Sequence, residues 1–60
     1  MNTDLLSLEE ASKLLSVKVS KLRSAVFKKQ VTYVKFGRLL RFKVKDLYDF
    51  IEKNTKEANM

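Results

Sequence analysis

The chain has 60 residues, a formal net charge of +6 and 45% hydrophobic residues. A chain of this length forms one small domain, which buries only about 60% of its unfolded surface and leaves no room for a separate catalytic or sensing domain. It contains no cysteine and no histidine, which excludes disulfides and the common zinc sites. Its carboxylates are not spaced as a catalytic pair. We therefore predict no enzymatic activity, no metal, no cofactor and no small-molecule ligand.

Positive charge is concentrated in the middle of the chain. Eleven lysines and arginines, and no acid, stand between Ala11 and Lys45. Because a solvated surface usually mixes both signs, this bias indicates a polyanionic partner, and double-stranded DNA is the first candidate. No apolar run approaches the roughly 20 residues that cross a bilayer, and residues 1–4 do not resemble the start of a signal peptide. We expect a cytoplasmic protein that does not bind membranes.

A first helix is predicted from about Leu8 to Leu15, after a flexible N-terminus at residues 1–4. Ser7 stands three residues before Glu10, which is the spacing of a capping box. Residues 16–18 break the helical pattern. We expect Val17, within this break, to place its side chain in the core.

A second helix is predicted to begin near Val19 or Ser20 and to end near Lys29. With Leu22 at the centre of its buried face, the opposite face is polar and basic, as expected of a helix that enters a DNA groove. The candidate DNA-binding residues of this helix are Lys18, Val19, Ser20, Lys21, Arg23, Ser24 and Lys28. Phe27 lies about 140° from Leu22, so either a later hairpin covers it or it is itself a contact.

Residues 33–44 alternate between apolar and basic side chains around Gly37, the single glycine, and this pattern predicts a β-hairpin. Two registers compete. A two-residue loop at 37–38 pairs Val34 with Arg41, which places a charge on the apolar face. A three-residue loop at 37–39 avoids this charge, so we favour the second register.

In the favoured register, Phe36 pairs with Leu40 and Val34 pairs with Phe42. All four side chains then share one face, and Lys35 and Arg41 share the other, solvent-facing side. The candidate DNA-binding residues of the hairpin are Lys35, Arg38 and Arg41, with Arg38 and Leu39 at the tip. A basic hairpin tip can enter the minor groove. Because Phe36 is expected in the core, its replacement by alanine should destabilise the fold.

A third helix is predicted from Lys45 to about Thr55. Leu47, Phe50 and Ile51 follow the i, i+3, i+4 spacing of a buried helix face. The helix is net negative, so it should close the core and face away from DNA. We expect one domain at residues 5–55, followed by a flexible C-terminus at residues 56–60.

These elements resemble the small excisionase-type proteins, or recombination directionality factors, of the MerR-like winged-helix superfamily. The resemblance runs without gaps over about residues 5–51 and is carried by the segments LLSLEEA (5–11), LLSV (14–17), VKFGRLLRF (34–42) and DL (46–47). It implies an α+β fold, a winged helix-turn-helix with a β-hairpin wing and a C-terminal helix. The base-reading positions that it implies are Val19, Ser20, Lys21, Arg23 and Ser24, with a wing contact at Arg38.

Four positions depart from the family pattern. Ser16 and Lys29 stand where glycine is common, Lys18 where a serine N-cap is common, and Thr32 where proline is common. We therefore expect the turn and the end of the second helix to be less sharply defined here. Ser20 is the alternative cap for that helix.

The resemblance implies a sequence-selective DNA-binding protein of a bacterial mobile element. It would act as an architectural factor on repeated sites, with a site-specific recombinase and neighbouring copies of itself as candidate partners, and would be associated with the nucleoid when bound. The alternative is a small transcriptional repressor or activator with the same DNA-binding mode. A third hypothesis is a protein-interaction module that binds an acidic protein surface.

Overall fold

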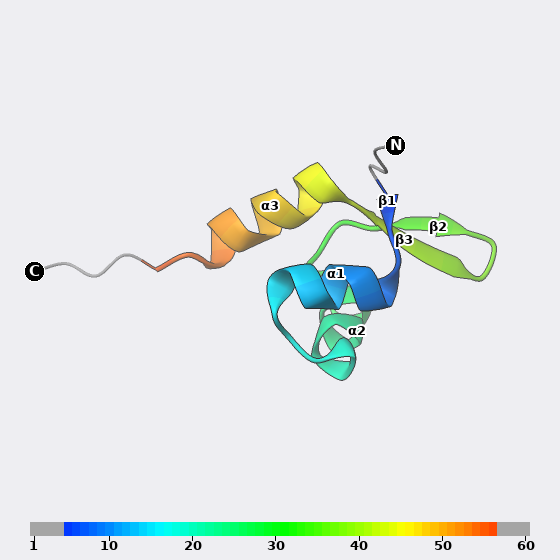
Figure 1. The fold of residues 1–60 in the computed structure, drawn as a ribbon, viewed down its shortest axis with the longest axis horizontal. Helices are drawn as coiled ribbons and strands as arrows, with labels where there is room; N and C mark the ends of the chain where they lie inside the picture. The colour runs from blue at the N-terminus through cyan, green and yellow to red at the C-terminus, as the bar shows by residue number, and fades with distance from the viewer. Residues whose placement is uncertain (1–4, 57–60) are drawn as a thin grey trace, which may run out of the picture.

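A computed structural model of the chain describes residues 5–56 (Figure 1). The elements in order are β1 (Leu5–Leu6), α1 (Leu8–Leu15), α2 (Val19–Phe27), β2 (Val34–Phe36), β3 (Leu39–Lys43) and α3 (Val44–Asn54). Over these described residues the fold is α+β, with three helices and one antiparallel sheet in the order β1-β3-β2. The β2–β3 hairpin and α3 project in opposite directions from the α1–α2 pair (Figure 1). The flexible N-terminus predicted at residues 1–4 lies outside the described residues, as do residues 57–60 of the flexible C-terminus predicted at 56–60.

The predicted start of α1 is confirmed in detail. The Ser7 hydroxyl accepts a hydrogen bond of 3.1 Å from the backbone N–H of Glu10, and the Glu10 carboxylate accepts one of 2.9 Å from the backbone N–H of Ser7. These two bonds satisfy backbone donors that the helix itself leaves unpaired. The helix therefore begins at the residue that the sequence pattern predicts.

A residue in the left-handed conformation follows each of the first two helices: Ser16 comes directly after α1, and Lys29 comes two residues after the end of α2. Ser16 has a φ of 56° and Lys29 a φ of 59°. After α2, the N–H of Gln30 donates to the carbonyl of Ala25 and that of Lys29 donates to Val26, which is a Schellman motif. The expectation that the turn and the end of the second helix are less sharply defined is wrong, because the backbone hydrogen bonds of this motif form without glycine.

The second helix begins at Val19, so the alternative start with Ser20 as the cap is wrong. Lys18 occupies the N-cap position, and its side chain makes no capping hydrogen bond. A serine hydroxyl at this position would accept a hydrogen bond from a backbone N–H, whereas a lysine ammonium group can only donate hydrogen bonds. The helix starts here because Leu22 and Ala25 are buried, not because of its cap.

The core lies where the helices meet the central strand β3. Leu22, Phe42 and Leu47 are almost completely buried, and they come from α2, β3 and α3. Ala11 on α1 is fully buried, and its small side chain allows α2 to pack close to α1. Val17 is 38% exposed, so the prediction that it lies in the core is wrong. It stands in the turn between α1 and α2 and lines a groove between α2 and α3.

The register of the β2–β3 hairpin differs from the prediction. Val34 pairs with Arg41, and Phe36 pairs with Leu39, so the loop contains two residues rather than three. Gly37, the first loop residue, has a φ of 60°, as in a type II′ turn. A three-residue loop would have placed Leu39 in the left-handed conformation, which a leucine disfavours. The backbone preferences of the turn residues therefore determine the register, even though this register does not keep all the apolar side chains on one face.

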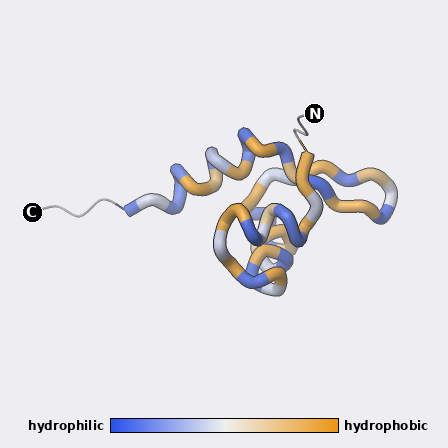
Figure 2. The backbone as a smooth tube through the Cα atoms, in the orientation of Figure 1, coloured by the Kyte–Doolittle hydropathy of each residue, from blue (hydrophilic) through white to orange (hydrophobic). Residues whose placement is uncertain are grey.

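This register changes which hairpin side chains face the core. Directly paired residues of antiparallel strands share a face, so Val34, Phe36 and Arg41 lie on the outer face of the sheet. Leu40 and Phe42 alternate to the inner face and pack in the core. Phe36 is 55% exposed, which contradicts its predicted burial. Figure 2 shows hydrophobic and hydrophilic residues alternating along the hairpin.

Strand β1 was not predicted, because two residues are too short to show alternation. Leu6 pairs with Phe42 and Leu5 with Lys43. The third helix begins at Val44, one residue before the predicted start, and buries Leu47. Among the helices within residues 5–56, none is long and apolar enough to cross a membrane.

Candidate nucleic-acid interface

The face of α2 opposite the core is polar and basic. Ser20 and Ser24 lie within about 20° of the direction opposite Leu22, given 100° per residue. The predicted contact residues of this region that are exposed are Lys18, Ser20, Lys21, Arg23, Ser24 and Lys28. Val19 is half-buried because it lies only about 60° from Leu22. The structure therefore presents six of the seven predicted α2 residues on an exposed surface.

Phe27 interrupts this polar face. Its side chain is 86% exposed, so the expectation that the hairpin covers it is wrong. The hairpin packs through β3 against α1 and α3 instead. The alternative expectation, that Phe27 is itself a contact, stays a prediction.

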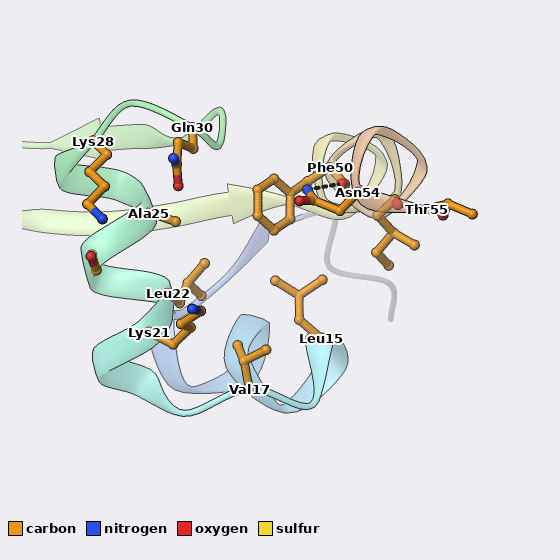
Figure 3. Close-up of a pocket in the computed structure, with 12 residues that line it drawn as sticks. Leu15, Val17, Lys21, Leu22, Ala25, Lys28, Gln30, Phe50, Asn54 and Thr55 are labelled. Carbon is orange, nitrogen blue, oxygen red and sulfur yellow. Dashed lines mark hydrogen bonds between the residues drawn. The ribbon is translucent and has the colours of Figure 1, made fainter. Parts of the chain in front are cut away.

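A groove of about 490 Å³ lies between α2 and the second half of α3 (Figure 3). The helix α3 packs against α1 and β3, and this arrangement leaves the space beside α2 open. The groove is lined by Leu15, Val17, Lys21, Leu22, Ser24, Ala25, Lys28, Gln30, Phe50, Ile51, Asn54 and Thr55. Among residues 5–56, no acidic side chain lines this groove, and its charged lining residues are Lys21 and Lys28.

The groove divides the exposed surface of α2 into two sides. Lys21, Ser24 and Lys28 lie on the side that borders the groove. Arg23 and Phe27 do not line it, because they are turned about 100° and 140° from Leu22 in the other direction. The two sides meet at the row of serines opposite the core. A duplex that approaches α2 along this row would have lysines on one side and Arg23 on the other.

The acidic side chains of α3 lie elsewhere. Asp46, Asp49 and Glu52 border a separate cavity of about 290 Å³, together with residues 30–32 that follow α2. The residues that α3 contributes to the groove beside α2 are all uncharged. Within residues 5–56, no three carboxylates, histidines or cysteines gather in a way that could hold a metal ion. The α3 carboxylates therefore lie outside the groove that Lys21 and Lys28 border, beside a cavity that Lys53 also lines.

The three basic residues predicted on the hairpin do not share one face. Arg38 is exposed in the two-residue turn at the tip, as predicted. Lys35 pairs with Leu40, so it lies on the inner face, whereas Arg41 lies on the outer face opposite Val34. The prediction that Lys35 and Arg41 share one solvent face is wrong, because the register is shifted by one residue.

The side chain of Arg41 also folds back onto the backbone of its own strand, β3. It is half-buried, and its guanidinium Nη1 donates a hydrogen bond of 2.7 Å to the carbonyl of Leu40. Arg38 is therefore the best placed hairpin cation for a ligand beyond the tip. Lys43, which was not among the candidates, is exposed on the same outer face as Arg41. Turn chemistry at Gly37 was the feature of the sequence that could have revealed this arrangement.

Comparisons with models of protein families, with curated proteins and with solved structures found no match to this chain.

Proposed function

We propose that the chain binds double-stranded DNA as a winged helix-turn-helix protein. In this proposal α2 enters the major groove and the β2–β3 hairpin is the wing. Ser20, Arg23 and Ser24 contact base edges, while Lys18, Lys21 and Lys28, which lie on one side of the helix, contact phosphates. This assigns Lys21 to a phosphate rather than to the base edge that the resemblance implies. Arg38, at the tip of the hairpin, reaches the adjacent minor groove.

One observation carries the proposal. The helix α2 buries Leu22 and Ala25 on one side and exposes only serines, cations and Phe27 on the other, with no acid on the helix. An ordinary solvated helix mixes both signs of charge, whereas a helix in a DNA groove faces phosphates and needs cations alone. The separation of the α3 carboxylates onto another surface supports the same conclusion.

The biological output that we propose is that of an excisionase-like architectural factor of a mobile element. A single module of this size buries roughly 600–1,000 Å² on DNA, so specific occupancy calls for several copies on repeated sites and for a recombinase partner. A small transcriptional regulator is the alternative. Mapping the bound sites in the genome distinguishes them, because the first requires sites beside a recombination attachment site and the second requires sites over a promoter.

The salt dependence of binding tests the proposed interface. We expect the logarithm of the association constant for a labelled duplex to fall linearly with the logarithm of salt concentration, with a slope of about −0.9 for each phosphate contacted. Lys21→Gln should make the slope less steep by about 1, because it removes one phosphate contact. Fluorescence anisotropy across a series of salt concentrations measures both slopes.

Lys53→Gln is the matched control, because it removes the same charge from an exposed position on α3, outside the proposed interface. Its slope should equal that of the wild type. Equal changes in the two variants would show that only net charge matters and would contradict the assignment of α2. Absence of duplex binding at low salt would favour the third hypothesis, a module that binds an acidic protein surface.

A further inference from the structure

Phe27 is the most exposed of the large hydrophobic side chains in the described part of the chain. Its exposed fraction is 86%, although it belongs to a regular helix whose neighbours Leu22 and Ala25 are buried. A single exposed apolar residue is ordinary on a protein surface. The exposure of Phe27 points to a function because of where the residue lies on α2.

Phe27 lies on the same surface of α2 as the residues proposed to read bases. Arg23 precedes it by four residues and Ser24 by three, so both are its direct neighbours on the helix surface. Ser20 precedes it by seven residues and lies within about 20° of it around the helix axis. A DNA duplex that contacts these three side chains also meets the phenyl ring.

The neighbours of Phe27 on the helix surface argue against a protein-docking patch. Such patches gather several apolar side chains, whereas the helix positions around Phe27 carry Ser20, Arg23, Ser24 and Lys28. A phenyl ring has no conventional hydrogen-bond donor or acceptor for a phosphate or a base edge. In the major groove, the C5-methyl group of thymine is the apolar group that it can contact.

Building on the proposed function, we propose that Phe27 selects A·T pairs by packing on a thymine methyl group in the major groove. This makes Phe27 a specificity-determining residue beside the polar readers of α2. Its contribution depends on one chemical group of the DNA, so it can be separated from the electrostatic contributions of the lysines.

The test uses a duplex selected from a random pool with the wild-type chain. Deoxyuridine then replaces thymine at each position of the selected site in turn, which removes the C5-methyl group and leaves the hydrogen-bonding groups unchanged. At one or two positions, we expect uracil to weaken binding by the wild type about fourfold. This is the change in affinity that corresponds to the burial of one methyl group. Competition binding at constant salt measures the ratio.

Phe27→Ala should bind the thymine and uracil duplexes equally, and Phe27→Leu should keep part of the preference because leucine retains an apolar contact. Both variants should fold, since the side chain is exposed, and circular dichroism checks this. Wild-type binding that is indifferent to uracil at every position would overturn the inference while leaving DNA binding intact. The same uracil sensitivity in Phe27→Ala would assign the methyl contact to another residue, and failure of the wild type to bind any duplex would overturn both proposals.

Discussion

Phe42→Ala is expected to lower the free energy of unfolding by about 3–5 kcal/mol, which is the usual cost of removing a fully buried phenyl ring. Phe42 is 0% exposed and stands on the central strand β3, in the cluster that also contains Leu22 and Leu47. A domain of this size has a net stability of only several kcal/mol. The variant should therefore be largely unfolded at room temperature, or unfold at much lower urea concentration than the wild type.

Phe36→Ala is the matched control, since it makes the same substitution in the same hairpin. Phe36 is 55% exposed and pairs with Leu39 on the outer face of the sheet, so its loss should cost less than about 1 kcal/mol. Urea denaturation followed by circular dichroism measures both variants. A large loss for both variants would contradict the two-residue loop and restore the register with three loop residues, in which Phe36 and Phe42 share the core face.

Arg23→Ala is expected to weaken binding to a selected duplex by about 1–3 kcal/mol, or roughly 5- to 150-fold. In the proposed complex, the guanidinium group donates two hydrogen bonds to one base edge, most commonly guanine. The loss should be largest on the selected site and small on unrelated DNA, because a base contact contributes to specificity. Anisotropy titrations with both duplexes at the same salt concentration measure the ratio.

Arg38→Ala provides the comparison, since it removes a guanidinium from the hairpin tip rather than from α2. We expect it to weaken binding to both duplexes while leaving the base preference in the major groove unchanged. If Arg38→Ala leaves the affinity untouched, the hairpin is not a wing. If Arg23→Ala weakens both duplexes by the same factor, Arg23 contacts phosphate and does not read a base.

Local patterns predict the helices of this chain well. The Ser7–Glu10 capping box marks the start of α1, and the spacing of Leu22 and Ala25 identifies the buried side of α2. These features depend on residues within two helical turns of one another, so a sequence alone contains them. The same helical periodicity predicts correctly that Ser20, Lys21, Arg23 and Ser24 are exposed on α2.

Features that depend on two competing preferences are harder to predict. In the hairpin, apolar segregation favours three loop residues, while Gly37 and Leu39 favour two, and the backbone preference prevails. The error moves Lys35 and Arg41 to opposite faces, because side chains alternate with a period of two. The exposure of Phe27 and Val17 also depends on the direction in which the hairpin and α3 project, which no local pattern specifies.

The most direct test of the proposed interface is an amide NMR titration of the chain with a selected duplex. The proposal predicts that the largest shift changes fall on residues 18–28 of α2 and on Gly37 and Arg38 at the hairpin tip. The acidic side of α3, around Asp46, Asp49 and Glu52, should change little. Shift changes centred on α3, or none on α2, would contradict the account that α2 is the DNA-reading element of this domain.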